Sequence, residues 1–331
     1  MTNPNSNPMP LIVDDDGSQD GMTALVYLLQ NPKFEVKAIT ISQGIAYPKI
    51  FGTNLMRMLA RLGKTGIPVG VGSETPLEGN NSFPEQFREE SNSFWSPFVS
   101  LPNQALETLD SRDAATLIID TIQQSPKPVT ILATGSLTNI AEALRQEPTI
   151  INNIASLHIM GGAVFVPGNL REHLDPMIKQ NQVAEFNIWV DPIAAQEVFK
   201  AASAGLKIIL TTLDATNQVG FSRGDQQAWK ATGTPEGIIA SEFLDFALSV
   251  ISGNDPLIPN PVWDLVAAIN LSEPSFCNPV PLHIQVDTMG KPNTTQGQTV
   301  VIENQPPNTY VCLNPSFNNL KFGTNEIFTN E

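Results

Sequence analysis

Pro10-Leu-Ile-Val-Asp-Asp-Asp-Gly-Ser-Gln-Asp-Gly-Met-Thr-Ala-Leu-Val-Tyr-Leu-Leu29 is the stretch of the chain that decides the fold. It opens with an apolar run, Pro10 to Val13, that stops at three aspartates and a glycine. From Met22 it continues with helix-forming residues as far as Asn31-Pro32. This order is typical of a strand, a loop and a helix.

The same alternation runs along most of the chain. Further strands are expected at 34–41, 67–71, 129–133, 157–160 and 207–210, and helices at 50–62, 114–123, 137–145 and 192–201. Short strands that alternate with helices of about ten residues indicate a parallel sheet covered on both faces. The sequence therefore predicts an α/β fold, in which a ligand would bind at the C-terminal ends of the strands.

Three parts of the chain depart from this alternation. The stretches 73–113 and 169–183 are long loops that we expect to lie over a site. After about residue 270, apolar runs at 282–286, 299–302 and 309–312 predict an antiparallel C-terminal β appendix. We expect residues 1–9 to be a disordered or extended polar tail, and residues 10–331 to form one large domain.

Composition limits the classes of partner. The 331 residues are 41% hydrophobic, which is enough for a large core, and carry a net charge of -15 without a basic cluster. Such a charge disfavours nucleic acid and anionic membranes as partners. The sequence lacks an apolar run long enough for a membrane span, so we expect a soluble protein. It would be cytoplasmic, or exported if the polar tail is the remnant of a trimmed signal.

The chain has two cysteines, Cys277 and Cys312. Two cysteines are too few for a disulfide scaffold or a cysteine-ligated zinc site, although they leave one disulfide open.

The loop after the first strand is densely acidic. Asp14, Asp15, Asp16 and Asp20 place four carboxylates within seven residues. Like charges at such distances raise one another's pKa, so a cluster of this kind holds a metal, shares protons or is fully solvated. In the solvated case, the last aspartate would simply cap the following helix. An EF-hand is excluded, because the 12-residue spacing and the terminal glutamate are absent.

The acidic loop and a series of later motifs resemble the inosine-uridine preferring nucleoside hydrolase family. Members of that family begin with Asp-x-Asp-Pro-Gly-x-Asp-Asp, where this chain has Asp14-x-Asp16-Gly-Ser-Gln-Asp20-Gly21. The resemblance continues through Ile39–Gly44, Leu132–Asn139, His158–Ala163, Val166–Asn169, Ala184–Pro192 and Val262–Ala268. It therefore covers most of the chain.

The resemblance implies a Rossmann-like fold, homodimers or homotetramers, and hydrolysis of the N-glycosidic bond of ribonucleosides by a Ca²⁺-bound water. Anionic groups would stabilise the ribosyl cation that forms as the bond breaks. Asp16 matches the family's general base and metal ligand, while Thr134, through its carbonyl, and Asp264 match two further ligands. The matching ribose-binding positions are Asp20, Met160, Asn169, Glu185 and Asn187.

Two departures from the family pattern concern the metal. The second aspartate of the family's Asp-Asp pair, a metal ligand, is Gly21 here, and an asparagine near the metal is Ile45. The residue between the first two aspartates, however, is Asp15, which restores the number of carboxylates. We therefore expect Asp15, or failing that Asp14, to replace the missing ligand.

A third departure concerns the leaving base. Trp263 stands where broad-specificity members carry a histidine that protonates the base. An indole cannot supply that proton, but it can stack on a purine, so a purine preference is favoured. The alternative is that His173 donates the proton from its loop. Phe186 is a further candidate for contact with the base.

Two other functions remain open at this stage. The first is a non-catalytic or weakly active protein that binds a sugar or a nucleoside in the same pocket. The second is a phosphatase or hydrolase of the haloacid type, which also opens with Asp-x-Asp after a first strand. The later motifs argue against the haloacid type.

Overall fold

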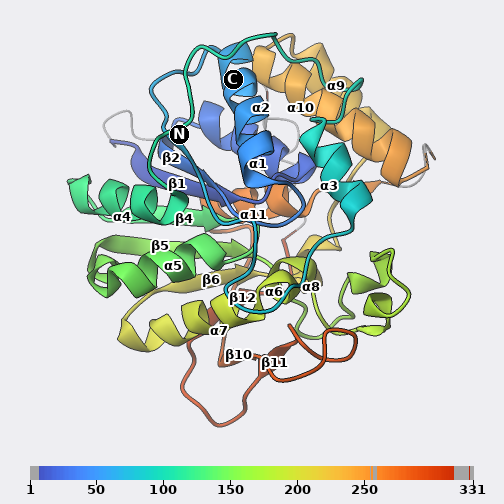
Figure 1. Ribbon diagram of the computed structural model, residues 1–331. Helices are drawn as coiled ribbons and strands as arrows, with labels where there is room; N and C mark the ends of the chain where they lie inside the picture. Colours follow the sequence, from blue (N-terminus) through green and yellow to red (C-terminus); the bar gives the residue numbers. More distant parts are fainter. Residues whose placement is uncertain (1–6, 254, 256–258, 317–327, 329–331) are drawn as a thin grey trace.

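A central sheet of eight strands organises the molecule, in the order β3-β2-β1-β4-β5-β6-β12-β9 (Figure 1). The computed structural model describes residues 7–253, 255, 259–316 and 328. The strands are β1 (Met9–Asp15), β2 (Phe34–Ile41), β3 (Val69–Val71), β4 (Val129–Ala133), β5 (Ile154–Met160), β6 (Ile208–Thr211), β9 (Val280–Leu282) and β12 (Thr309–Cys312). Every neighbouring pair is parallel except β12 and β9.

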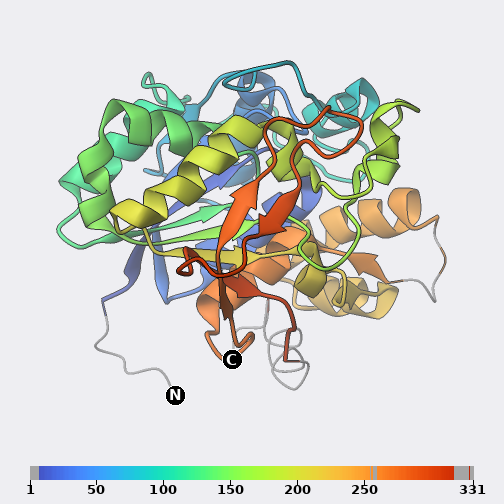
Figure 2. The ribbon, with the colours of Figure 1, turned by 90° about the horizontal axis from the view of Figure 1, so that it is seen from below.

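Helices cover both faces of this sheet (Figure 2). One face carries α4 (Ala114–Gln124), α5 (Thr138–Gln146) and α7 (Pro192–Ala201). The other carries α1 (Gln19–Gln30), α2 (Pro48–Arg61), α9 (Arg223–Ala231), α10 (Pro235–Phe246) and α11 (Trp263–Ser272). Leu11 and Val13 pack into the core under α1, whereas Ile12 packs into the opposite core, as the alternation of side chains along a strand requires. The predicted α/β fold is confirmed.

The remaining elements are short. The α-helices are α3 (Glu85–Asn92), α6 (Phe186–Val190) and α8 (Leu213–Thr216). The 3₁₀-helices are η1 (Pro148–Asn153), η2 (Leu170–Glu172), η3 (Ile178–Gln180) and η4 (Ala202–Ala204), and η5 (Ala247–Ile251) is a π-helical turn. β7 (Gly220–Phe221) and β8 (Asn260–Pro261) form a small antiparallel pair.

The C-terminal part differs from the predicted appendix in one respect. β10 (Ile284–Val286) and β11 (Thr299–Val301) form a separate antiparallel pair, as expected. β12, however, lies in the central sheet, where it is parallel to β6 and antiparallel to β9. A disulfide between Cys277 and Cys312 ties β12 to the segment that follows α11. The C-terminal strands thus complete the main sheet.

At the N-terminus, the predicted polar tail falls largely outside the described residues, which begin at residue 7. β1 already includes Met9. Among the helices of the described chain, none combines the length and the apolar character needed to cross a bilayer.

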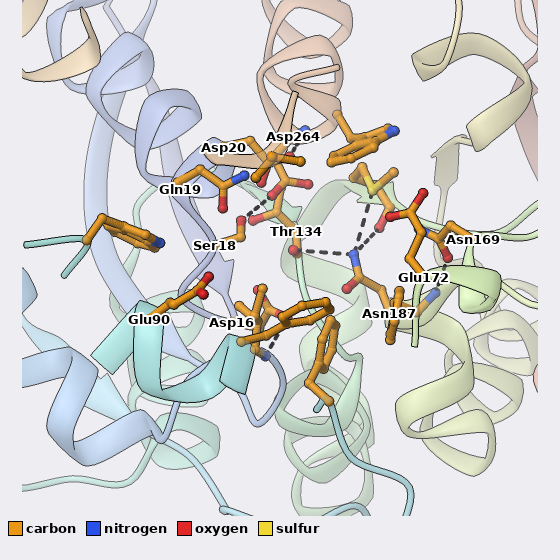
Figure 3. A pocket seen from close by; sticks show the side chains of 18 of the residues that line it. Asp16, Ser18, Gln19, Asp20, Glu90, Thr134, Asn169, Glu172, Asn187 and Asp264 are labelled. Carbon is orange, nitrogen blue, oxygen red and sulfur yellow. Dashed lines mark hydrogen bonds between the residues drawn. The ribbon is translucent and has the colours of Figure 1, made fainter. Parts of the chain in front are cut away.

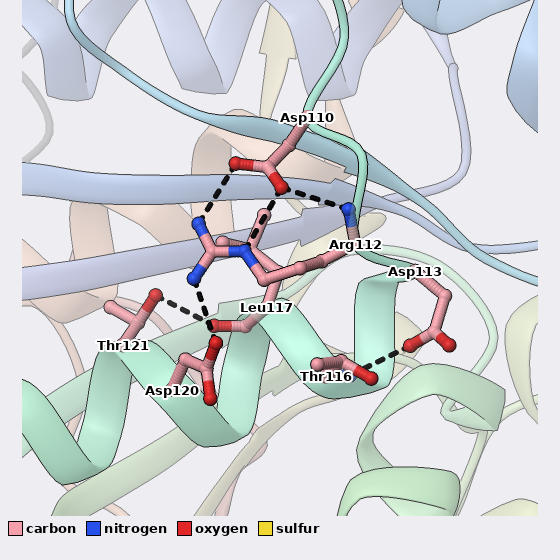
Figure 4. A network of polar contacts seen from close by, with 7 residues as sticks. All are labelled: Asp110, Arg112, Asp113, Thr116, Leu117, Asp120 and Thr121. Atoms are coloured by element: carbon pink, nitrogen blue, oxygen red, sulfur yellow. Dashed lines mark hydrogen bonds and ion pairs between the residues drawn. The ribbon is translucent and has the colours of Figure 1, made fainter.

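The long loop 73–113 is anchored where it returns to the sheet (Figure 4). Arg112 lies 2.8 Å from a carboxylate oxygen of Asp110 and 2.8 Å from one of Asp120 on α4. The hydrogen bonds from Arg112 lower the pKa of Asp110 to about 2. Asp113 then caps α4 by accepting a 2.7 Å hydrogen bond from the backbone N–H of Thr116. The end of the loop is therefore held in place by both backbone and side chains.

Candidate active site

A cavity of about 330 Å³ opens at the C-terminal ends of the parallel strands (Figure 3). The order of the sheet reverses around β1 and β4, which is where ligands bind in open α/β sheets. The polar residues that line the cavity include Asp16, Asp20, Thr134, Glu185, Asn187 and Asp264. The aromatic residues that line it include Phe83, Phe87, Trp95, Phe186, Phe246 and Trp263. Both long loops contribute residues to this lining. Polar and aromatic side chains thus share one cavity.

Asp14 and Asp15 face opposite sides of the sheet, because successive side chains on a strand alternate. Asp14 accepts hydrogen bonds from the hydroxyl of Thr40, at 2.5 Å, and from the amide of Asn139 on α5, at 2.7 Å. Asp15 instead accepts a 2.7 Å hydrogen bond from the hydroxyl of Thr134. The carboxylate of Asp14 thus lies on the side of α5, which favours Asp15 over Asp14 as the replacement for the missing ligand.

The carboxylate of Asp15 fills the space in front of Gly21. A Cβ atom added at Gly21 would lie 1.9 Å from Oδ2 of Asp15. Residue 21 can therefore have no side chain while Asp15 keeps this position. Asp15 is fully buried and lies beneath the cavity, outside its lining.

Asp16 follows the end of β1 and reaches the cavity. Its Oδ2 accepts a 3.1 Å hydrogen bond from the backbone N–H of Ile45. A Cβ atom would lie 2.2 Å from Oδ2 of Asp16 if added at Gly44, and 2.5 Å from its Cβ if added at Gly135. These two glycines leave the room that Asp16 occupies. Burial, followed by the charge of Asp15, raises the pKa of Asp16 well above its usual range.

Asp264 enters the site from α11, more than two hundred residues away in sequence. Ser18 caps α1 by accepting the N–H of Gly21, and it donates its hydroxyl to Oδ2 of Asp264 at 2.8 Å. The backbone N–H of Asp264 donates to Oδ2 of Asp20 at 3.2 Å. Burial raises the pKa of Asp264, and the like charge of Asp20 raises it further. These contacts fix the start of α1 against the start of α11.

The charge and chemistry of this cluster fit a divalent cation. Four buried carboxyls gather here, on Asp15, Asp16, Asp20 and Asp264, and burial raises the pKa of each. The charges of neighbouring carboxylates raise the pKa of Asp15, Asp16 and Asp264 further. All the ligand atoms would be oxygens, which suits Ca²⁺ better than Zn²⁺. Within the residues described, however, no group of three or more acidic, histidine or cysteine side chains is assembled as a metal cage. The carboxylates would have to close around the ion.

The raised pKa values predict how stability depends on pH. Burial raises the pKa of Asp15 and of Glu185 to about 7, above their usual values of 3.8 and 4.5. The stability that these two protonated carboxyls contribute is therefore fully present at a pH below their usual pKa values. It is lost as the pH rises through their raised pKa of about 7. We expect the Tm of the cation-free protein to fall by roughly 5 °C or more between pH 5 and pH 8.

Added Ca²⁺ should restore most of that loss at pH 8, because the cation balances the same charges. Thermal melts with and without chelator would measure both effects. A Tm that is constant or rises between pH 5 and pH 8 without cation would contradict the expected burial of these carboxyls.

The candidate ribose-binding residues cluster around the start of α6. Glu185 caps this helix and accepts 2.9 Å hydrogen bonds from the N–H groups of Gly162 and Asn187. The amide of Asn187 donates to the carbonyl of Met160 at 3.2 Å. Asn169 accepts a 3.0 Å hydrogen bond from the backbone N–H of the residue that follows Glu185. Glu185 and Asn187, at the cap and within the first turn of α6, both line the cavity.

Aromatic rings line the cavity as well. Phe186 stacks on Phe83 with ring centroids 4.5 Å apart. Trp263 also lines the cavity, but its indole N–H donates to Oδ1 of Asn217 at 2.9 Å. Trp263 can therefore offer a ring face to a base. Trp95 is both a cavity residue and a buried anchor, only 3% exposed among the rings of the core.

His173 does not line the cavity, which counts against its expected role as a proton donor. Its Nδ1 accepts the backbone N–H of Asp175 at 3.0 Å, so its Nε2 carries the hydrogen and lies 3.3 Å from the carbonyl of Ser82. Its ring stacks on the outer side of Phe186 at 6.1 Å. Burial lowers its pKa, which keeps it neutral. His173 joins the two long loops.

Several lining residues escaped the reasoning from sequence. They are Ser18, Gln19, Phe83, Gln86, Phe87, Glu90, Glu172, Phe246, Val250 and Ile251. Ser18 could have been found, because it stands at the helix cap inside the acidic loop. The others lie on loops or helices whose course the local pattern does not reveal.

Comparison with known proteins identifies the family. Residues 11–321 match the inosine-uridine preferring nucleoside hydrolase family. The protein named pyrimidine-specific ribonucleoside hydrolase RihA from Citrobacter koseri is 35% identical over 294 residues, or 88% of each chain. The RihA of Salmonella newport is 33% identical over 310 residues, or 92% of this chain and 93% of its own.

Solved structures share the fold. The purine-preferring ribonucleoside hydrolase from Gardnerella vaginalis superposes with a TM-score of 0.82 at 24% identity, over 96% of this chain and 98% of its own. The inosine-uridine preferring nucleoside hydrolase from Bacillus anthracis gives 0.80 at 23% identity, over 97% and 99%. With the match of the sequence over nearly its whole length, these likenesses lead to one conclusion: the chain belongs to the inosine-uridine preferring nucleoside hydrolase family.

Proposed function

We propose that this protein hydrolyses the N-glycosidic bond of ribonucleosides, with Asp16 as the general base. The observation that carries the proposal is the position of Asp16, whose carboxyl lies in the cavity beside Asp20, Glu185 and Asn187. A carboxylate at this position can take a proton from the attacking water. The surrounding carboxylates would stabilise the positive charge that develops on the ribosyl ring.

Ca²⁺ is the cation that we propose for the cluster of buried carboxyls. Asp16, Asp264, the carbonyl of Thr134 and Asp15 would hold it, with Asp15 acting in the place left free at Gly21. Bound there, the ion would position the attacking water and make it more acidic. Asp15 already accepts a hydrogen bond from the hydroxyl of Thr134, whose carbonyl is another of the proposed ligands.

The ribose hydroxyls would be bound between α1 and α6. Asp20 offers carboxylate oxygens from one side, and Asn187 and Glu185 offer polar atoms from the other. Glu185 is itself held by three backbone N–H groups, which makes it a rigid acceptor. A site built around hydroxyls in this way discriminates against substrates that lack them. We therefore expect ribonucleosides to be preferred over 2′-deoxyribonucleosides.

For the base, we propose pyrimidines. The purine preference expected from Trp263 is not supported by the relatives, whose names describe pyrimidine-specific enzymes at 33–35% identity. The stacked pair of Phe83 and Phe186 and the ring of Trp263 offer aromatic faces that any base can use.

Release of reducing sugar from uridine, cytidine, inosine and adenosine, measured with Ca²⁺ present, tests this proposal. We expect kcat/KM for uridine and cytidine to exceed that for inosine by at least about tenfold, a difference that about 1.4 kcal/mol of transition-state binding would give. A higher value for inosine would overturn the pyrimidine preference. Binding of nucleosides without any sugar release would favour a non-catalytic binding protein.

A further inference from the structure

Gly17 is the residue of the acidic loop with the most backbone freedom. Its φ of +90° lies in the region that favours glycine, and a residue without a Cβ atom can leave such a conformation easily. It stands between Asp16, the proposed base, and Ser18, whose hydroxyl donates to Asp264. A rotation of the backbone at Gly17 would therefore move the two halves of the acidic loop relative to each other.

Two side chains hold the peptide groups of Gly17. Its N–H donates to Oδ1 of Asp15 at 2.7 Å, and its carbonyl accepts a 2.5 Å hydrogen bond from the hydroxyl of Ser91. Ser91 lies on α3, 74 residues further along the chain, and is fully buried. Because a buried carbonyl without a partner is costly, this hydrogen bond favours the one conformation of Gly17 in which it can form.

Ser91 can act in this way because α3 is itself anchored. Oδ1 of Asn92 accepts the backbone N–H of Tyr47 at 3.0 Å, and the carbonyl of Asn92 accepts the amide of Asn54 on α2 at 2.9 Å. The guanidinium of Arg88 lies over the ring of Tyr47, 3.8 Å from its centroid. The hydroxyl of Ser91 is thus presented by a helix that is fixed against its surroundings.

The same helix also supports the segment that binds Asp16 directly. Arg88 donates to the carbonyl of Ala46 at 3.4 Å. The N–H of Ala46 donates to the carbonyl of Asp16 at 3.0 Å, and the N–H of Ile45 donates to its Oδ2 at 3.1 Å. Glu90, also on α3, lines the cavity (Figure 3). This helix therefore supports both the backbone and the carboxylate of Asp16.

We propose that Ser91 is a positioning residue for Asp16, an inference that rests on the proposed function. Ser91 does not line the cavity, so it acts without touching the substrate. Its hydroxyl holds the turn at Gly17, and the turn sets the direction of the Asp16 carboxylate toward the attacking water. A displacement of about 1 Å at a reacting group can lower the rate about 10²-fold, so loss of this hydrogen bond should affect turnover more than binding.

Ser91→Ala tests the proposal, because it removes the hydroxyl and leaves the other anchors of α3 in place. At saturating Ca²⁺, with the better substrate of uridine and inosine, we expect kcat to fall about 10 to 10²-fold. KM should stay within about threefold of the wild-type value, since Glu185 and Asn187 are unchanged. Ser91→Cys, whose thiol is a weaker donor in the same place, should lose less activity, and it supplies the same test if Ser91→Ala does not fold.

Ser93→Ala is the matched control, because the hydroxyl of Ser93 is exposed and donates to the carbonyl of Glu90 within the same helical segment. Its kcat and KM should equal those of the wild-type protein.

A double variant separates positioning from a general loss of structure. In the Asp16→Asn background there is no base to position, so Ser91→Ala should change kcat by less than about twofold. A fall by the same factor in both backgrounds, or a normal kcat in folded Ser91→Ala, would overturn the role of Ser91. If the wild-type protein releases ribose from neither nucleoside, the proposed function itself fails.

Discussion

Asp16→Asn is expected to lower kcat for ribose release by at least about 10²-fold while the fold stays intact, because the amide cannot accept a proton from water. The side chain is nearly isosteric, and it can still accept the backbone N–H of Ile45 that orients Asp16. Steady-state kinetics on uridine, together with a thermal melt, would measure the two effects separately.

The matched control is Asp14→Asn, two residues earlier in the chain. Its side chain faces α5 and does not line the cavity, so kcat should stay within about threefold of the wild-type value. Near-normal activity in Asp16→Asn with an unchanged melt would remove Asp16 from the role of base.

Asp15→Ala is expected to abolish the rise in Tm that Ca²⁺ gives at pH 8, because it removes the carboxylate that stands in the space before Gly21. The double variant Asp15→Ala with Gly21→Asp should restore this rise, since a carboxylate then returns from α1. Calorimetric titration with Ca²⁺ would give the affinities directly. Unchanged Ca²⁺ affinity in Asp15→Ala would reject the exchange of ligands.

The same two positions should also be coupled in stability. Gly21→Ala in the wild-type background would place a Cβ atom 1.9 Å from Asp15, and should cost about 1 to 3 kcal/mol in the free energy of unfolding. In the Asp15→Ala background only the 2.8 Å contact of this Cβ atom with Oγ of Ser18 remains, so the same change should cost less. Additive effects of the two substitutions would show that the side chains do not compete for this space.

Much of the fold could be predicted from local pattern. The expected strand 129–133 and helix 192–201 coincide with β4 and α7, because each is a complete apolar or amphipathic run between clear breaks. The place of β12 could not be predicted. Its partner β6 lies about a hundred residues earlier, and a run of four residues carries no signal for the strand that it will join.

The candidate site also has features that could be predicted from the sequence and features that could not. That Asp14 and Asp15 face opposite sides of the sheet could be predicted from the alternation of side chains along β1, although the alternation does not say which side holds the cavity. The engagement of Trp263 with Asn217 could not, since 46 residues separate them. Glu172 and His173 are neighbours in the sequence, yet one lines the cavity and the other joins two loops. The turn of η2 decides which of the two side chains reaches the cavity.

Simultaneous quantification of free base and ribose, by chromatography of a reaction of the wild-type protein with uridine and Ca²⁺, tests the central claim most directly. Hydrolysis of the N-glycosidic bond predicts that uracil and ribose form in equal amounts, in many turnovers per protein molecule, and that chelation of Ca²⁺ reduces both. Uridine that binds, as measured by calorimetry, but is recovered intact after prolonged incubation would contradict it.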